Sequence, residues 1–137
     1  MPARTELLKA VPLFAGLDKK DLELLANTFK ERTFSSGEQI AREGDRGIGF
    51  FIIESGTARV SQGGEERGHL GPGDYFGEIA LIDEGARSAT VTADTPLRCY
   101  GMTSWEFRPL VETNASIAWH LLQTMAKRLR AAERRIA

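Results

Sequence analysis

The sequence predicts a mainly β fold, a jelly-roll-like β-roll with helices before and after it. Between Lys30 and Thr103, short runs rich in β-branched and aromatic residues alternate with turn residues. Every glycine except Gly16 lies in this stretch. Outside it, apolar residues recur at helical spacing. Several short strands separated by glycine-containing turns are typical of a sandwich or a jelly roll, so we expect strands to form the body of the domain.

The chain of 137 residues is expected to form one domain with three parts. Helices are predicted in residues 1–29, the β-roll in residues 30–103, and further helices in residues 104–137. A hydrophobic content of 42% and a charged content of 27% are ordinary for a globular chain with one core.

The N-terminal part contains two predicted helices. The first spans Glu6 to Val11 and ends at Pro12. Asp18 is a suitable N-cap for a second helix that continues to about Phe29. One face of this second helix is apolar and should pack against the body of the domain: Leu22, Leu25, Ala26 and Phe29.

Seven strands are predicted in the central part. They are Glu31–Phe34, Gln39–Arg42, Gly49–Ser55, Thr57–Gln62, Arg67–Leu70, Ala89–Ala93 and Leu97–Thr103. After them, Thr103 and Glu106 form a capping box that opens a short helix to about Val111, although Pro109 limits its regularity.

A long helix is expected next, capped by Asn114 or Ser116 and continuing to near the C-terminus. Its apolar residues form one broad stripe: Ile117, Leu121, Leu122, Met125, Leu129, Ala132 and Ile136. The stripe could pack on the roll as a lid or against a second copy in a homodimer. The basic residues of this helix are Lys127, Arg128, Arg130, Arg134 and Arg135, against one acidic residue, Glu133. A solvated face explains them better than a partner-binding or nucleic-acid-binding role.

The segment from Tyr75 to Ala93 contains residues that indicate a ligand site. Gly77 lets the backbone turn tightly, and Glu78-Ile79-Ala80-Leu81 is long enough for about one helical turn. The start of a helix leaves backbone N–H groups without partners and carries partial positive charge. The turn is therefore suited to hold an anion.

Side chains near this turn extend the same interpretation. Arg87 adds a full charge and a planar set of donors that suits phosphate oxygens. Ser88 supplies a hydroxyl donor, and Ala89 is small enough for its N–H to approach a ligand. Glu78 offers an acceptor for a sugar hydroxyl. Together these groups fit a singly charged phosphate that carries a ribose.

These residues resemble a known motif. The sequence Phe76-Gly77-Glu78-Ile79-Ala80-Leu81, followed by Arg87-Ser88-Ala89-Thr90-Val91, is similar to the phosphate-binding cassette (residues 76–90) of the cyclic nucleotide-binding domain. This family includes the sensors of bacterial catabolite activator proteins, cyclic-nucleotide-gated channels and cAMP-dependent kinase regulatory subunits. The resemblance extends from about Leu7 to Arg130. It implies that Glu78 holds the ribose 2′-hydroxyl, that Arg87 pairs with the cyclic phosphate, and that amides of the turn complete the anion site.

The resemblance implies a 3′,5′-cyclic nucleotide as ligand, with cAMP favoured over cGMP, and no cofactor. The predicted ligand-binding residues are Phe76, Gly77, Glu78, Ile79, Ala80, Arg87, Ser88, Ala89 and Arg128. Arg128 resembles in position an arginine that caps the purine in channels, and the alternative is a solvated position on the helix. Binding is expected to draw the helix that begins near Ser116 onto the roll. The protein would then be a sensor that signals to an effector protein, and not an enzyme.

Several other classes of function are not expected. The single cysteine, Cys99, excludes an internal disulfide, and with His69 and His120 it gives no metal-ligand spacing. No catalytic constellation is visible. The formal charge of −1 argues against nucleic-acid binding within this chain. The longest apolar run, Phe50–Ile53, is too short to cross a membrane, and the N-terminus lacks a secretory signal, so a cytoplasmic location is expected.

Two alternatives remain open at this point. The chain could be a ligand-free interaction module that dimerises through its last helix, with an Arg87–Glu78 ion pair bracing the loop. It could also be the truncated sensor half of a transcription factor or a channel, because a catabolite activator would continue into a DNA-reading helix-turn-helix.

Overall fold

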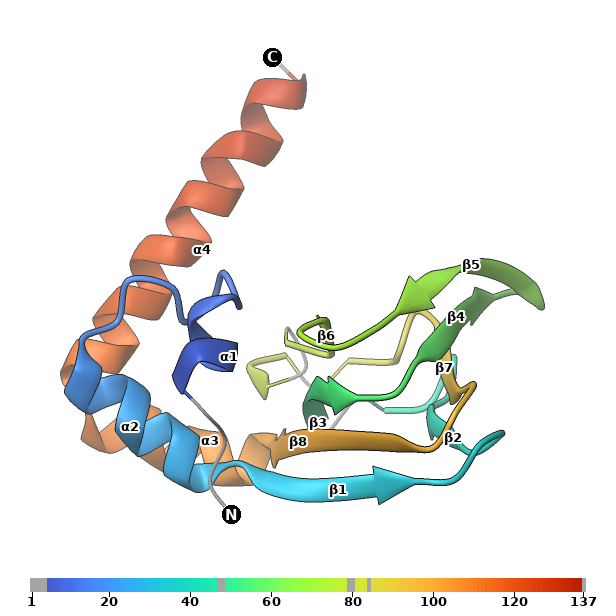
Figure 1. Cartoon of the computed structure of the whole chain (residues 1–137). Coiled ribbons are helices and arrows are strands. Elements are labelled where there is room, and N and C mark those ends of the chain that lie inside the picture. The colour runs from blue at the N-terminus through green and yellow to red at the C-terminus, as the bar shows by residue number, and fades with distance from the viewer. Residues whose placement is uncertain (1–4, 47–48, 79–80, 84, 137) are drawn as a thin grey trace.

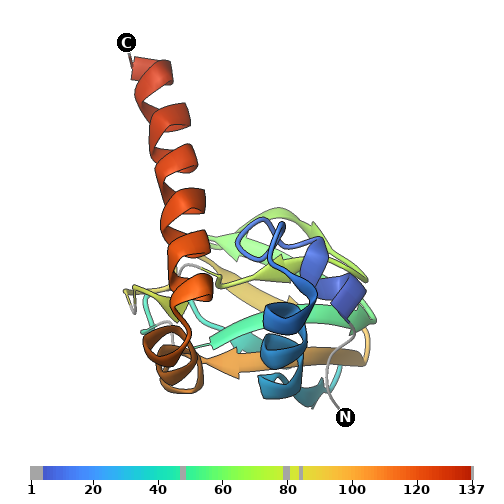
Figure 2. The ribbon, with the colours of Figure 1, turned by 90° about the vertical axis from the view of Figure 1, so that its left-hand side faces the viewer.

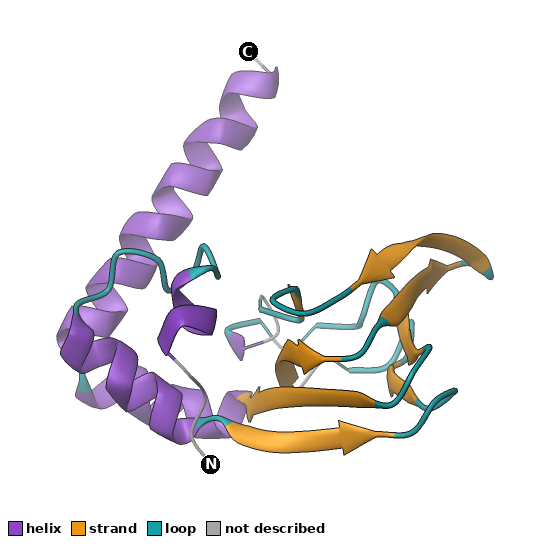
Figure 3. Ribbon diagram, viewed as in Figure 1, coloured by secondary structure: helices purple, strands orange, loops and turns teal. Residues whose placement is uncertain are grey.

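The computed structural model describes residues 5–46, 49–78, 81–83 and 85–136. Two antiparallel sheets form a roll on one side of the molecule, and the helices gather on the other side (Figures 1 and 3). The sheets pair strands that are far apart in the sequence. The predicted fold class, a jelly-roll-like β-roll with helices before and after it, is confirmed.

Each sheet contains four strands. The first sheet has the order β1–β8–β3–β6, formed by β1 (Lys30–Phe34), β8 (Leu97–Thr103), β3 (Gly49–Ser55) and β6 (Tyr75–Phe76). The second has the order β2–β7–β4–β5, formed by β2 (Gln39–Ala41), β7 (Thr90–Ala93), β4 (Ala58–Gln62) and β5 (Glu65–Leu70). The segment between β6 and β7 is the predicted cassette, so it connects the two sheets.

All seven predicted strands are present, and their bounds move by at most two residues. β6 is an additional strand, too short for alternation to reveal it, and it pairs with β3 so that Phe76 lies opposite Phe51. β5 begins earlier than predicted, at Glu65, because Glu65 pairs with Gln62 across the turn Gly63-Gly64. Both glycines of this turn have positive φ, which a two-residue hairpin requires.

Four helices complete the described chain: α1 (Thr5–Lys9), α2 (Lys19–Thr28), α3 (Ser104–Thr113) and α4 (Ala115–Ile136). The Asp18 carboxylate accepts a hydrogen bond from the N–H of Asp21 at 2.9 Å, which confirms the predicted N-cap of α2. Glu106 accepts from the N–H of Thr103 at 3.0 Å, in agreement with the predicted capping box. α1 ends two residues earlier than predicted. α3 continues through Pro109 and ends two residues later than predicted.

Aromatic rings from several elements meet in the main core. The ring of Phe50 on β3 contacts those of Phe14, Phe29 and Tyr75, with centroid distances of 5.9, 5.9 and 6.1 Å. Phe107 of α3 contacts Phe14 at 6.4 Å. The α2 residues predicted to pack on the domain are all buried: Leu22, Leu25, Ala26 and Phe29. This core fixes the N-terminal helices and α3 to the first sheet.

α4 contacts the rest of the domain along its first part, and its C-terminal end projects away. Ser116 lies inside the helix, so of the two predicted caps Asn114 precedes it, and the Ser116 hydroxyl donates to a carboxylate oxygen of Asp21 at 2.8 Å. Ile117 and Leu121 are buried in the main core. Met125 packs against the same core and Arg128 bonds to Glu78, and the helix beyond them projects away from the body of the domain (Figure 2). The predicted apolar stripe therefore divides into a buried part and an exposed part.

Replacing Phe50 with alanine is expected to lower the free energy of unfolding by about 3–5 kcal/mol, because the substitution removes a fully buried ring and leaves a cavity among three others. Urea denaturation of the Phe50→Ala and Phe50→Leu variants measures the effect, and the leucine variant should lose less stability. A loss for Phe50→Ala below about 1 kcal/mol would show that this core does not hold the helices to the sheet.

Candidate functional site

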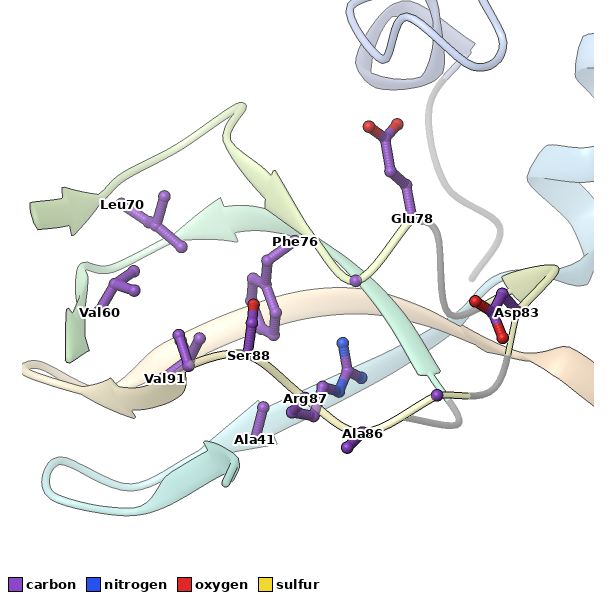
Figure 4. A pocket seen from close by; sticks show the side chains of 13 residues that line it. Ala41, Val60, Leu70, Phe76, Glu78, Asp83, Ala86, Arg87, Ser88 and Val91 are labelled. Atoms are coloured by element: carbon purple, nitrogen blue, oxygen red, sulfur yellow. The ribbon is translucent and has the colours of Figure 1, made fainter. Parts of the chain in front are cut away.

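A cavity of about 390 Å³ lies between the second sheet and the cassette, a volume suited to a small molecule. Its lining residues are Ala41, Val60, Leu70, Phe76, Gly77, Glu78, Asp83, Gly85, Ala86, Arg87, Ser88, Ala89 and Val91. Figure 4 shows apolar side chains of β4, β5 and β7 at one end, Arg87 and Ser88 in the middle, and two carboxylates at the other end. The cavity thus has an apolar end and a charged end.

Arg87 is a half-buried cation at the centre of the site. Its guanidinium donates a short hydrogen bond to the main-chain carbonyl of Gly49. Burial lowers the pKa of Arg87 from its ordinary value, although an arginine stays protonated at neutral pH. The ion pairs found among the described residues all involve side chains other than Arg87. No carboxylate of the described residues therefore lies within 4.0 Å of the Arg87 guanidinium. A partly desolvated cation without a counter-ion favours the binding of an anion.

The main chain of Arg87 is held by the turn Glu43-Gly44-Asp45, which lies between β2 and β3. The N–H of Arg87 donates to the carbonyl of Asp45 at 2.7 Å, and the N–H of Gly44 donates to the carbonyl of Arg87 at 2.9 Å. These bonds connect the loop between β2 and β3 to the cassette. The turn Glu43-Gly44-Asp45 is visible in the sequence, but nothing in it indicates which distant residue it contacts.

Gly77 allows the chain to pass directly over the guanidinium. Its φ is +84°, a left-handed conformation that favours glycine. A Cβ atom at Gly77 would lie 2.3 Å from Nη1 of Arg87 and 2.5 Å from the carbonyl oxygen of Gly49. Both distances are far below van der Waals contact. The left-handed φ and the fixed main-chain carbonyl of Gly49 therefore require glycine at this position, and the guanidinium of Arg87 adds to the crowding.

Glu78 lines the cavity but does not face Arg87 (Figure 4). Its Oε1 accepts a hydrogen bond from Nη2 of Arg128 on α4 at 3.0 Å. Its Oε2 is buried and has no hydrogen-bond partner among the described residues. Burial is the main cause that raises the pKa of the neighbouring Tyr75, and the negative charge of Glu78 raises it further. The ion pair between Arg87 and Glu78, considered as an alternative from the sequence, is not formed in the described part of the chain.

The other predicted site residues occupy different positions. Phe76 stacks on Phe51, with centroids 5.3 Å apart, and lines the cavity. Ser88 and Ala89 also line it, and the Ser88 carbonyl accepts a hydrogen bond from Gln62 at 2.9 Å. Ile79 and Ala80 were also predicted to bind the ligand, and both lie outside the described residues.

Arg128 is separate from the main cavity. It lines a neighbouring cavity of about 160 Å³, together with Glu78 and Met125. It therefore reaches the site only through its bond to Glu78. No residue of α4 lines the main cavity, so in this structure the helix does not cover it.

Other chemistry has little support in the described residues. Burial raises the pKa of the Cys99 thiol to about 12, which keeps it protonated and unreactive. No cluster of three or more potential metal ligands occurs among these residues. No helix in the described part of the chain combines the length and the hydrophobicity needed to cross a membrane.

The variants Gly77→Ala and Gly73→Ala test the close packing at Arg87. Both glycines have a positive φ, +84° and +88°, but no atom lies within 4 Å of a Cβ placed at Gly73. Gly73→Ala should lower the free energy of unfolding by about 1–2 kcal/mol, the cost of a left-handed alanine. Gly77→Ala should cost about 1–3 kcal/mol more, because the guanidinium and the Gly49 carbonyl must also move. Equal losses in chemical denaturation would contradict this interpretation.

Comparison with known proteins agrees with the geometry. The family described as "Cyclic nucleotide-binding domain" matches residues 31–114. A cyclic AMP receptor protein of Thermus thermophilus is 34% identical over 131 residues, which cover 92% of this chain and 61% of that protein. The chain therefore spans less than two thirds of this relative.

Solved structures show the same architecture. The N-terminal domain of a transcriptional regulator from Streptomyces coelicolor A3(2) superimposes with a TM-score of 0.88 at 27% identity, covering 96% of this chain and 95% of that one. The regulatory domain of Toxoplasma gondii PKA, crystallised with cAMP, gives a TM-score of 0.70 at 34% identity, covering 77% and 42%. With the family match over residues 31–114, these findings show that the chain belongs to the cyclic nucleotide-binding domain family.

Proposed function

We propose that this protein binds a 3′,5′-cyclic nucleotide, with cAMP favoured over cGMP, and acts as a non-catalytic sensor. The observation that carries the proposal is the half-buried guanidinium of Arg87, which faces a cavity of about 390 Å³ without a carboxylate partner among the described residues. The cyclic phosphate monoanion supplies the missing charge and presents oxygens to the planar donors of arginine. The cAMP in the related Toxoplasma structure supports the choice of ligand.

The remaining parts of the nucleotide find complementary surfaces in the same cavity. Glu78 has one carboxylate oxygen, Oε2, that is buried and without a hydrogen-bond donor among the described residues. A ribose hydroxyl would supply a donor to this oxygen once the Glu78 side chain turns toward the cavity, because Oε2 is closed to solvent in this structure. Val60, Leu70 and Val91 form the apolar end of the cavity, which suits the flat face of a purine. Phosphate, ribose and base would thus each meet a surface of suitable chemistry.

The bond between Glu78 and Arg128 links the site to α4. Glu78 belongs to the cassette and Arg128 to α4, so a ribose that bonds to Glu78 changes the surroundings of Arg128. Leu81, which follows in the cassette, packs in the same core cluster as Ile117 and Leu121 of α4. A ligand shifts a conformational equilibrium only by its difference in affinity for the two states. In this mechanism, the state with α4 drawn toward the roll binds the nucleotide more tightly.

The exposed part of α4 supports homodimerisation as a further element of the proposal. Trp119, Leu122 and Leu129 are 63%, 61% and 61% exposed and lie on one face of the helix. With Ala126 between them, their spacing alternates between three and four residues, as in a two-helix coiled coil. A second copy would bury this row, and movement of α4 would then be transmitted through the dimer to an effector protein.

Removing the Arg87 side chain should weaken nucleotide binding strongly. Hydrogen bonds with charged groups contribute roughly 1.5–3 kcal/mol each, so Arg87→Ala should lower cAMP affinity on the order of a hundredfold or more. Isothermal titration with cAMP and cGMP measures this. Arg98→Ala is the matched control, since Arg98 lies on β8, is paired with Glu31 at 2.7 Å and should leave binding unchanged.

The outcomes of this titration separate the proposals. If the wild-type protein binds neither cyclic nucleotide, the interaction-module interpretation replaces the sensor. If Arg87→Ala binds cAMP as tightly as the wild type does, the anion site lies elsewhere.

A double-mutant cycle of Glu78→Gln and Arg128→Met tests the proposed link to α4. If Arg128 acts through Glu78, the loss of cAMP binding free energy in the double variant should be smaller than the sum of the single losses, by about 0.5–3 kcal/mol. If Arg128 instead caps the purine on its own, the two losses should add. Calorimetric titration of all four proteins distinguishes these cases.

A further inference from the structure

We infer that a second copy of this chain covers an apolar groove beside the cassette, so that the dimer contact includes cassette and α3 residues as well as α4. This inference rests on the homodimer proposed above. It adds a specific surface and a direct route from the nucleotide site to the partner. The surface and the route can be tested separately from nucleotide binding.

The groove is larger than the nucleotide cavity and mainly apolar. Its volume is about 610 Å³, and it lies between α3, α4 and the end of the cassette. Leu81 and Ile82 of the cassette form one wall, and Trp105 of α3 forms part of another. The remaining lining includes Phe107, Val111, Ala118, Leu121, Leu122 and Met125. The polar residues of the lining are Ser104, Arg108 and Glu112, and the last two pair with each other at 3.4 Å.

Exposed apolar side chains are concentrated at this groove. In the part of the chain that the structure describes, the large apolar residues with high exposure are Ile82, Trp105, Trp119, Leu122 and Leu129. Ile82, Trp105 and Leu122 line the groove, with exposures of 53%, 62% and 61%. Trp119 and Leu129 continue the same surface along α4, three residues before and seven residues after Leu122. Exposed apolar residues gathered in one patch indicate an interaction surface.

A helix from a second copy fits this surface better than other occupants do. The row on α4 formed by Trp119, Leu122, Ala126 and Leu129 has the spacing of a coiled coil, which favours a helical partner. The small side chain of Ala126 permits the two helices to approach closely. In a parallel pair with this row at the contact, Arg130 of one helix would lie beside Met125 of the other, and Glu133, the next position of the row, would face its own copy near the outer end of the helix. The basic residues Lys127 and Arg134 lie away from the row. The C-terminal end of α4 also projects beyond the body of the domain (Figure 2).

Leu122 belongs both to the α4 row and to the groove. A helix packed on the row would therefore run along the groove and contact Trp105 and Ile82. Ile82 is four residues after Glu78 and five before Arg87, within the cassette that holds the nucleotide. The partner would thus contact the moving part of the site directly. By linkage, nucleotide binding and association must then affect each other equally.

Sedimentation of the full chain, with and without saturating cAMP, tests the inference. Trp105→Ala should raise the dimer dissociation constant about tenfold or more, as expected for a buried tryptophan at an interface. Ile82→Ala should also weaken the dimer and reduce the effect of cAMP on it, which should be about fivefold or more in the wild type. Trp119→Ala reports the α4 contact alone. Lys20→Ala, on exposed α2 surface, is the control and should change nothing.

The results have distinct meanings. A dimer weakened by Trp119→Ala but unchanged by Trp105→Ala and Ile82→Ala would overturn the inference, since the contact would then be limited to α4. A wild-type chain that stays monomeric at all concentrations would also overturn it. A dimer that depends on Trp105 and Ile82, but whose chain binds no cyclic nucleotide in calorimetry, would support the surface while removing the proposed ligand.

Discussion

The arrangement of the site depends on one half-buried positive charge. Arg87 lies beneath the backbone of Gly77, with its guanidinium bonded to a main-chain carbonyl and burial lowering its pKa. Partial desolvation of a cation costs free energy that a single carbonyl does not recover. The roll therefore carries a local electrostatic imbalance that a monoanion can correct. Glu78 points away from Arg87 and pairs with Arg128, so this charge has no carboxylate partner among the described residues.

The scaffold holds this charge through segments that are distant in sequence. The loop after β2 fixes the main chain of Arg87 through Gly44 and Asp45, and β3 supplies the Gly49 carbonyl. β3 is anchored in turn by Phe50 in the aromatic core, which also holds α2 and α3. Site and core are therefore parts of one packed unit. On the far side, Glu78 and Arg128 connect the unit to α4, which carries the exposed apolar residues Trp119, Leu122 and Leu129.

Local patterns in the sequence were enough to predict most of the fold. The strand Leu97–Thr103, the cap at Asp18 and the buried face of α2 all follow from short-range propensity and periodicity. The chemistry of residues 76–91 and their resemblance to the phosphate-binding cassette placed Gly77 and Arg87 in one site. Local patterns could not show β6, which has two residues and exists only because β3 lies beside it. They also could not show which partner Glu78 takes, because Arg128 is 50 residues away. Side-chain direction and long-range pairing depend on the assembled sheets.

A crystal structure of the chain with cAMP would test the central claim most directly. The account predicts the cyclic phosphate at the guanidinium of Arg87, with nitrogen–oxygen distances of about 2.7–2.9 Å, and a ribose hydroxyl on Oε2 of Glu78. A nucleotide bound elsewhere, with Arg87 still bonded only to the Gly49 carbonyl, would contradict it.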